Sequence, residues 1–180
     1  KELQDLEAAH PEFFDANSPT LRVGGGITKN FPTVQHQYRM YSLDNSYDFD
    51  DLEDWEKRIT KTIEEPVEFV AELKYDGASI SILYENGKLS QAVTRGDGFQ
   101  GDEITNNVRT ISDIPLTLKG DFPNRFFIRG EIYLTRKNFD KINKSREEEG
   151  LDLFMNPRNT ASGSLKMQDS GEVRKRGLSA

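Results

Sequence analysis

The dipeptide Asn86-Gly87 constrains the fold of this chain more than any other feature of its sequence. It separates residues 78–84 from residues 88–94, and both runs have the composition of β-strands. Asn and Gly both tolerate the positive φ that the two central residues of a tight hairpin turn require. The sequence therefore predicts an antiparallel pair of strands in which the first strand has one apolar face. The side chains expected on that face are Ala78, Ile80, Ile82 and Tyr84.

Three segments have the apolar spacing and the end signals of helices. They are residues 1–9, 50–65 and 135–149. The first should end at His10-Pro11 and the second at Pro66, because proline cannot continue a helix. Thr135 should cap the third helix at its start, and Gly150 should end it.

The helix expected over 50–65 carries an apolar stripe on one side. Its members are Leu52, Trp55, Ile59 and Ile63. Such a stripe normally packs against the rest of a domain. We therefore expect Trp55 to lie in the core rather than to bind a ligand.

Residues 67–74 and 125–134 also have the composition of strands. Together with the hairpin and the helices they predict an α+β fold with a largely antiparallel sheet and flanking helices, in which Lys74 lies near a strand end. At 180 residues and 34% hydrophobic content, the chain can bury one main core with an appendage. Linker-like composition through Gly24-Gly25-Gly26 indicates a domain boundary between about residues 18 and 30.

The overall charge and composition exclude several classes of function. A net charge of −7 argues against a module that holds nucleic acid by its own overall field. The chain has no cysteine, which excludes disulfides and thiolate zinc sites within these residues and suits the cytosol. We also expect no membrane span and no signal peptide. Its only two histidines, His10 and His36, are far apart in sequence, which makes a histidine-based metal site or triad improbable.

Lys74 stands in Lys74-Tyr75-Asp76-Gly77, a pattern that indicates a lysine nucleophile. A lysine amine attacks phosphorus only when neutral, so burial under a sheet or nearby cations such as Arg95 must favour the neutral form. Gly77 would let the backbone approach a nucleotide, and Asp76 would orient the amine or its support. The alternative is a solvated lysine before an Asp-Gly turn, since so short a pattern also arises by chance.

Three further residues are candidates for the same pocket. Glu72 and Lys74 would point to one face of a shared strand, so that Glu72 could meet a base while Lys74 meets a phosphate. Arg95 follows the hairpin at a glycine-rich turn and could pair with phosphate or ribose oxygens. Glu131 interrupts an apolar strand, which indicates a nearby ligand or a buried polar partner. The alternatives are a solvated carboxylate for Glu72, a surface turn for Arg95 and an ion pair with Arg129 for Glu131.

The chain closely resembles the adenylation region of bacterial NAD-dependent DNA ligases. Six segments appear in the order and spacing of that family across almost the whole chain. They are Ser42-Leu43-Asp44-Asn45, Glu72-Leu73-Lys74-Tyr75-Asp76-Gly77, Ala92-Val93-Thr94-Arg95-Gly96-Asp97-Gly98, Asn107-Val108-Arg109-Thr110-Ile111, Arg129-Gly130-Glu131, and Asn156-Pro157-Arg158-Asn159 with Ala161-Ser162-Gly163-Ser164-Leu165. The resemblance implies the nucleotidyltransferase fold of ligase adenylation domains, ATP-grasp-like and incomplete at its C-terminal end.

The same resemblance implies the reaction and the residues that carry it. Lys74 would take the adenylyl group from NAD, and the group would pass to the 5′-phosphate at a nick in double-stranded DNA. The cofactor-binding residues would be Ser42, Leu43, Glu72, Asp76, Arg95 and Glu131. Arg158 and Lys166 would lie along the DNA or phosphate path. Lys166 stands where the family usually has arginine, so it keeps the charge but loses the planar fork.

Further expectations concern the cofactors and the rest of the enzyme. NAD and Mg²⁺ (or Mn²⁺) are implied, without assigned metal ligands. Residues 1–30 would be a remnant of the family's helical nicotinamide mononucleotide domain, and residues 31–180 the first part of the nucleotidyltransferase domain. We expect a part of a monomeric, cytoplasmic ligase that is weakly active or inactive by itself. The alternatives are an ATP-dependent ligase or capping-type nucleotidyltransferase, and a non-catalytic nucleic-acid-binding module.

Overall fold

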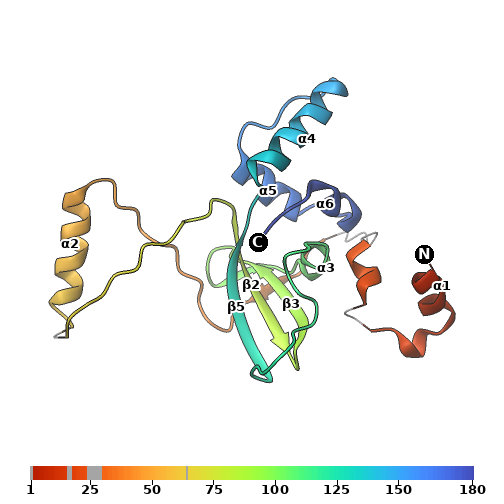
Figure 1. Cartoon of the computed structure of the whole chain (residues 1–180), viewed down its shortest axis with the longest axis horizontal. Helices are drawn as coiled ribbons and strands as arrows, with labels where there is room; N and C mark the ends of the chain where they lie inside the picture. The colour runs from red at the N-terminus through yellow and green to blue at the C-terminus, as the bar shows by residue number, and fades with distance from the viewer. Residues whose placement is uncertain (1, 16–17, 24–29, 64) are drawn as a thin grey trace. The chain divides into compact units, whose positions relative to one another are not determined.

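A computed structural model gives the fold of the chain (Figure 1). It describes residues 2–15, 18–23, 30–63 and 65–180. The chain divides into two units: residues 1–40 with 75–180, called here the main unit, and residues 41–74, called the 41–74 segment. The mixed architecture, with antiparallel sheets and flanking helices, confirms the predicted fold class.

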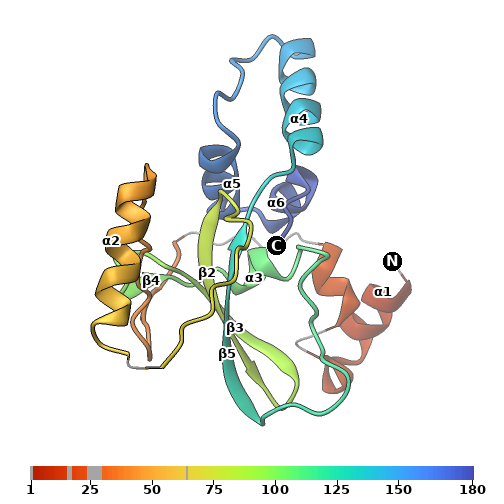
Figure 2. The same cartoon turned by 60° about the vertical axis from the view of Figure 1, so that its left-hand side comes forward.

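A three-stranded antiparallel sheet forms the centre of the main unit (Figure 2). Its spatial order is β3, β2, β5, with β2 at Ala78–Glu85, β3 at Lys88–Thr94 and β5 at Arg125–Ile132. The predicted hairpin is confirmed, since Asn86 and Gly87 join β2 to β3 with φ values of 49° and 74°. The central strand β2 is thus paired along both of its edges.

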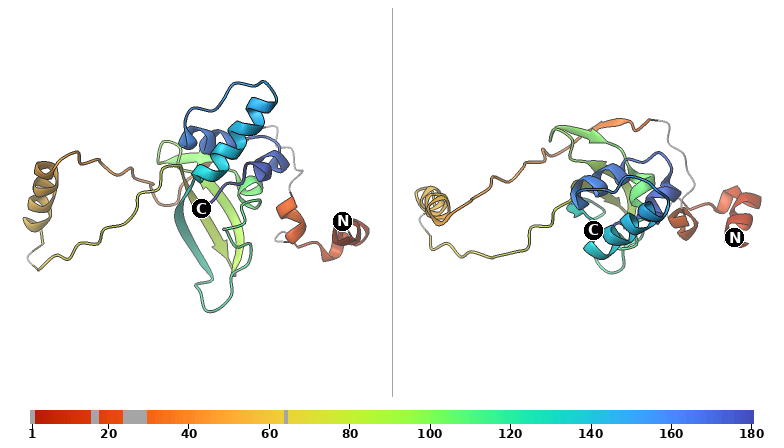
Figure 3. Two further views of the ribbon diagram at one scale, coloured as in Figure 1. Left: turned by 45° about the horizontal axis from the view of Figure 1, so that its top comes forward. Right: turned by 90° about the horizontal axis from the view of Figure 1, so that it is seen from above.

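Shorter elements complete the main unit. A second antiparallel pair joins β1 to β4, and single helical turns follow the N-terminal helix. Their bounds are α1 Glu2–Ala9, the 3₁₀ turns η1 Pro11–Phe13 and η2 Pro19–Val23, β1 Thr33–Gln35, β4 Gln100–Asp102, and the helices α3 Thr105–Val108, α4 Arg136–Glu148, α5 Pro157–Leu165 and α6 Ser170–Arg176. Figure 3 shows the three C-terminal helices gathered near one end of the sheet.

The helix ends agree with the signals in the sequence. Helix α1 stops before His10-Pro11, and α4 begins after Thr135, whose side chain accepts a hydrogen bond from the Asn138 amide at 3.2 Å. Gly150 follows α4 with a φ of 69°, as a helix-ending glycine does. Both predicted helices are therefore confirmed.

The core covers one face of the sheet. The alternating side chains of β2 supply Ile80, Ile82 and Tyr84 to it, and Ala78 packs against its edge. Val108 of α3, Leu165 of α5 and Val173 of α6 close the core, and all three are almost completely buried. The predicted apolar face of β2 is thus confirmed, and burial of these side chains is the main stabilising term for the unit.

The 41–74 segment contains one helix, α2 at Phe49–Thr60. Asp48 caps it by accepting a hydrogen bond from the Asp51 amide at 2.9 Å. The helix ends before the expected stop at Pro66. The strand predicted over 67–74 is wrong, because residues 65–74 have neither helix nor strand geometry. A strand requires a hydrogen-bonding neighbour, which apolar composition alone does not supply.

The prediction that Trp55 lies in the core is also wrong. Its side chain is 44% exposed and contacts the Phe69 ring at a centroid distance of 5.2 Å. No residue of helix α2, including those of the apolar stripe that it contains, is buried. The apolar stripe therefore predicted the helix correctly, but the prediction that the stripe is buried was wrong. Among the described residues, no helix has both the length and the apolar character needed to cross a membrane.

Candidate functional site

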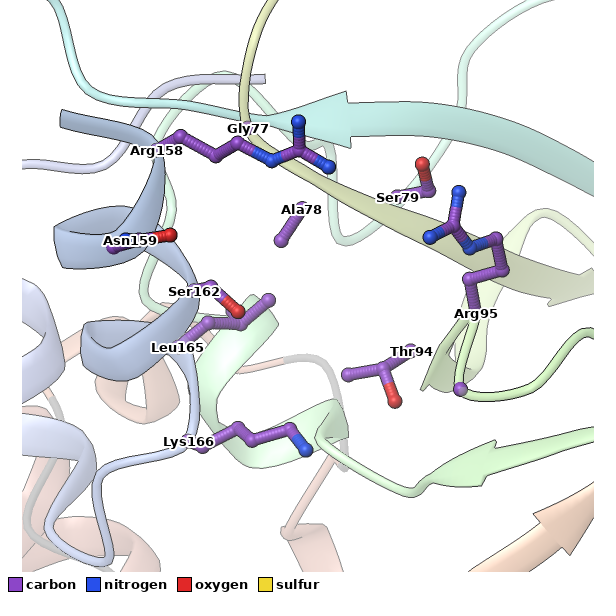
Figure 4. A pocket seen from close by; sticks show the side chains of 11 residues that line it. Gly77, Ala78, Ser79, Thr94, Arg95, Arg158, Asn159, Ser162, Leu165 and Lys166 are labelled. Atoms are coloured by element: carbon purple, nitrogen blue, oxygen red, sulfur yellow. The ribbon is translucent and has the colours of Figure 1, made fainter. Parts of the chain in front are cut away.

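A cleft of about 220 Å³ opens in the main unit between the start of β2, the turn after β3 and helix α5 (Figure 4). Its walls carry two arginines, one lysine and several small polar side chains, and the guanidinium groups of Arg95 and Arg158 both project from the walls toward β2. The lining residues are Gly77, Ala78, Ser79, Thr94, Arg95, Gly96, Arg158, Asn159, Ser162, Leu165 and Lys166. Such a concentration of positive charge in a hollow favours an anionic ligand.

Arg95 is placed by the end of β3 and the turn that follows. Its amide donates to the Ser79 carbonyl at 2.9 Å, and its carbonyl accepts from the Gly98 amide at 3.0 Å. The turn needs its glycines, since Gly96 has a φ of 56° and a Cβ there would lie 1.9 Å from the Gln100 carbonyl oxygen. The predicted turn is confirmed, and it directs Arg95 into the cleft rather than onto an unrelated surface.

Asp97 stabilises the same turn. Its carboxylate accepts hydrogen bonds from the amides of Gln100 at 2.9 Å and Phe99 at 2.8 Å. These two bonds favour the ionised form and hold the pKa of Asp97 below its ordinary value. Acid conditions that protonate Asp97 should therefore loosen the turn that carries Arg95.

Helix α5 supplies the opposite wall. Asn156 caps its start by accepting from the Asn159 amide at 3.2 Å, and Pro157 occupies the first turn. Arg158 then reaches Asp76, with 3.2 Å between Nη1 and Oδ1. At the end of the helix, Lys166 Nζ lies 2.5 Å from Asp102 Oδ2. Both cations thus line the cleft while each is paired with a carboxylate.

Glu131 binds the backbone where β2 begins. Its Oε1 accepts from the Gly77 amide at 3.1 Å, and its Oε2 accepts from the Ser79 hydroxyl at 2.7 Å. Arg129 donates instead to the carbonyls of Tyr38 and Arg39, so it is not the partner of Glu131 that the ion-pair alternative required. Glu131 therefore has a buried polar partner, the Gly77 amide. A buried polar partner was one of the two explanations that the sequence indicated for a carboxylate in this strand.

The remaining predicted residues lie in the 41–74 segment. Ser42, Leu43, Glu72 and Lys74 are all exposed there. The expectation that Glu72 shares a strand with Lys74 is wrong, because the strand over 67–74 does not form.

Comparison with known proteins identifies the family. Residues 28–180 match the model of the NAD-dependent DNA ligase adenylation domain. The chain belongs to that family. It is similar to a DNA ligase of Flavobacterium johnsoniae, with 65% identity over 99% of this chain and 27% of that protein. A DNA ligase of Parabacteroides distasonis is 55% identical over 100% of this chain and 27% of that protein. The chain thus spans about a quarter of the length of these curated relatives.

The supporting role of Asn107 in this adenylation domain was not predicted, although the residue stands in one of the six matching segments. Asn107 is 1% exposed, and its side-chain amide donates to the carbonyls of Leu165 at 2.8 Å and Met167 at 2.9 Å. These two bonds hold the end of α5 on either side of Lys166. A polar residue between Ile104 and Val108, both buried, was the available signal, but its partners are too distant in sequence to infer.

No group of three or more metal-ligating side chains occurs in the part of this adenylation domain that the structure describes. Magnesium commonly takes only one or two carboxylates and completes its shell with water and substrate phosphates. We therefore assign no metal ligand to the chain.

Proposed function

We propose that this chain is the adenylation part of an NAD-dependent DNA ligase, with Lys74 as the nucleophile. The Lys74 amine, after losing a proton, attacks the adenylyl phosphorus of NAD. The new N–P bond forms as the P–O bond to nicotinamide mononucleotide breaks, so that nicotinamide mononucleotide leaves and lysyl-AMP remains. A 5′-phosphate at a DNA nick then takes the adenylyl group, and the 3′-hydroxyl displaces AMP.

The observation that carries the proposal is the cationic cleft beside the segment that follows Lys74. Gly77 lines that cleft and lies three residues after Lys74, a distance that the backbone spans in at most about 11 Å. Arg95, Arg158 and Lys166 give the cleft the charge that a dinucleotide's phosphates require. The family match over residues 28–180 supports the same conclusion.

Different residues of the cleft and its surroundings would contact different parts of the ligand. Arg95 and Arg158 would bind phosphate oxygens through paired N–H groups, and Lys166 would act as a point charge on the path of the DNA phosphate. Glu131 would contact the ribose or phosphate from the position where it already holds Gly77. Asp76 would orient Arg158, with which it forms an ion pair.

The 41–74 segment would supply the adenine contacts together with the nucleophile. Ser42 and Leu43 would lie against the adenylate, and Glu72 would bind the base. When bound, Mg²⁺ or Mn²⁺ would offset the charge on the phosphate oxygens, and the chain's own role is to hold those phosphates with its arginines.

The proposal extends to the whole protein. Residues 1–30 would be the remnant of a nicotinamide mononucleotide-binding domain and residues 31–180 the start of the nucleotidyltransferase domain, as the match beginning at residue 28 supports. The partner would be nicked double-stranded DNA, bound largely by other parts of a monomeric cytoplasmic enzyme. The net charge of −7 is consistent with that division. The chain alone would adenylate poorly or not at all.

Intact mass tests the proposal directly. The chain, and the complete ligase that contains it, would each be incubated with magnesium and either NAD or ATP, alongside Lys74→Ala and Lys137→Ala variants. We expect the complete ligase to gain the mass of AMP from NAD alone, and Lys74→Ala to gain none. Lys137 lies on the exposed side of α4, so its replacement controls for the loss of a surface lysine.

Four results would contradict the proposal or a part of it. An adduct on the Lys74→Ala variant would place the nucleophile elsewhere, and an adduct from ATP alone would indicate the ATP-dependent class. Strong retention of DNA by a complete protein that never forms an adduct would favour a binding module. Sealing by the isolated chain at the rate of an intact ligase would overturn its proposed dependence on the missing parts.

A further inference from the structure

Residues 36–40 form a strap that crosses from β1 toward the start of the 41–74 segment. The strap is held by the turn after β3: the His36 amide donates to the Phe99 carbonyl at 2.8 Å, and the Met40 amide donates to the Gly98 carbonyl at 2.9 Å. His36 Nε2 also lies 3.1 Å from the Arg95 carbonyl. The strap therefore touches the turn that directs Arg95 into the cleft.

Arg129 of β5 also binds the strap. Its Nη2 donates to the Tyr38 carbonyl at 3.0 Å and to the Arg39 carbonyl at 2.8 Å. Hydrogen bonds from a charged donor are stronger than those between neutral groups. The two accepting residues lie three and two residues before Tyr41, where the 41–74 segment begins.

The other end of the 41–74 segment returns to the same strand. Directly after Lys74, the Tyr75 ring packs on the Tyr133 ring at a centroid distance of 4.7 Å. Two residues later the Gly77 amide donates to Glu131 at 3.1 Å. Arg129 and Glu131 have the same parity along β5, and Tyr133 directly follows the strand, so the chain from the first anchor to the last spans at most about 13 Å.

We infer that Arg129 is a positioning residue for adenylation, because it fixes the entry of the segment whose exit Glu131 and Tyr133 fix. The inference rests on the proposed role of Lys74. None of the segment's described residues is buried, so a nucleophile that it carries depends on the two junctions for its position. A displacement of the reacting amine by about 1 Å costs up to roughly a hundredfold in rate.

Arg125 provides a matched control on the same strand. It is exposed like Arg129 and has the same parity along β5, but its guanidinium donates to the side chains of Glu85 at 3.2 Å and Gln37 at 2.8 Å. Its hydrogen bonds therefore go to side chains, whereas those of Arg129 go to main-chain carbonyls of the strap. Replacing either arginine by methionine keeps the aliphatic stem and removes the donors.

The test compares Arg129→Met, Arg129→Lys and Arg125→Met in the complete ligase. Single-turnover formation of lysyl-AMP would be followed across NAD concentrations, together with sealing of a pre-adenylated nick, which does not use the Lys74 amine as nucleophile. For Arg129→Met we expect the maximal adenylation rate to fall about tenfold or more, as displacement of a reacting group predicts. The half-saturating NAD concentration, the melting temperature and the sealing rate should change by much less, and Arg129→Lys should recover part of the loss.

The results distinguish a positioning role of Arg129 from a general effect on stability or charge. An Arg129→Met rate within about twofold of the unmodified protein would overturn the inference, as would equal losses in both reactions with a lowered melting temperature. An equal loss in Arg125→Met would also overturn it, since charge on the strand would then be responsible. If Lys74→Ala still formed the adduct, the proposed function would fail together with this inference, whereas the other outcomes leave the proposed function intact.

Discussion

The 41–74 segment and the main unit contribute to the proposed site in opposite ways. The main unit holds Arg95 and Lys166 on elements that pack against a buried core, and each has a defined partner or turn. None of the described residues of the 41–74 segment is buried, although it carries Lys74 and Glu72. The contrast teaches that cations for a ligand can stand on elements packed against a core, while the proposed nucleophile stands in a segment without a buried residue among those described.

Matched leucine substitutions offer the largest test of this contrast. Leu89 is 1% exposed in the core, and Leu52 of α2 is 46% exposed. We expect Leu89→Ala to lower the free energy of unfolding by about 2–5 kcal/mol, and Leu52→Ala by less than about 1 kcal/mol. Urea unfolding followed by circular dichroism measures both. Equal losses would mean that the 41–74 segment packs as tightly as the core.

Glycine substitutions sharpen the comparison at the junction. A Cβ on Gly77 would lie 2.0 Å from the Ile132 carbonyl oxygen, whereas a Cβ on Gly163 of α5 would meet nothing within 4 Å. Gly77→Ala should therefore destabilise the protein by about 1–3 kcal/mol, as overpacking does. Gly163→Ala should instead stabilise it by up to about 1 kcal/mol, because alanine favours the helix.

Thermal unfolding of the two glycine variants checks this prediction. A Gly77→Ala protein as stable as the unmodified one would show that the start of β2 can move away from β5. The anchor at Glu131 would then be too loose to define the exit of the 41–74 segment.

Acid sensitivity gives the smallest expected effect. Because hydrogen bonds lower the pKa of Asp97 in the folded state, its contribution to stability is present above about pH 4 and is lost as pH falls through the folded-state pKa. Asp97→Asn keeps an oxygen acceptor but removes the charge, so it should flatten the loss of stability below about pH 4. Asp44→Asn, in the 41–74 segment, is the control.

Urea midpoints measured between about pH 2 and 6 separate the two aspartate variants. An unchanged slope in Asp97→Asn would mean that the turn carrying Arg95 does not depend on the ionised carboxylate.

The parts of the fold that were predictable are those set by neighbours in sequence. Asn86-Gly87 required a hairpin, and Thr135 capped the helix that directly follows it. The strand expected over 67–74 failed because strand formation depends on a partner that composition does not identify. Trp55 failed for a similar reason: an apolar stripe shows that a helix has a face to cover without showing what covers it.

The sequence indicated the three cations of the cleft, but it did not indicate their contacts. Arg95, Arg158 and Lys166 were identified individually, and the structure brings them to one cleft. Their carboxylate partners, such as Asp102 for Lys166, lie far away in sequence and follow only from the folded arrangement. The hydrogen bond from the Arg129 side chain to the Tyr38 carbonyl was likewise not predictable, because a pattern of side chains does not identify a main-chain acceptor far away in sequence.

The hairpin between β2 and β3 also implies an order of events during folding. Its turn closes between adjacent residues and can form within microseconds, whereas pairing of β2 with β5 must first close a much longer loop. One edge of β2 therefore stays open until β5 arrives. Early in refolding, pulsed hydrogen exchange should find the hairpin amides protected before those of β5, and the late docking of β5 is the step that brings its anchors to the junctions of the 41–74 segment.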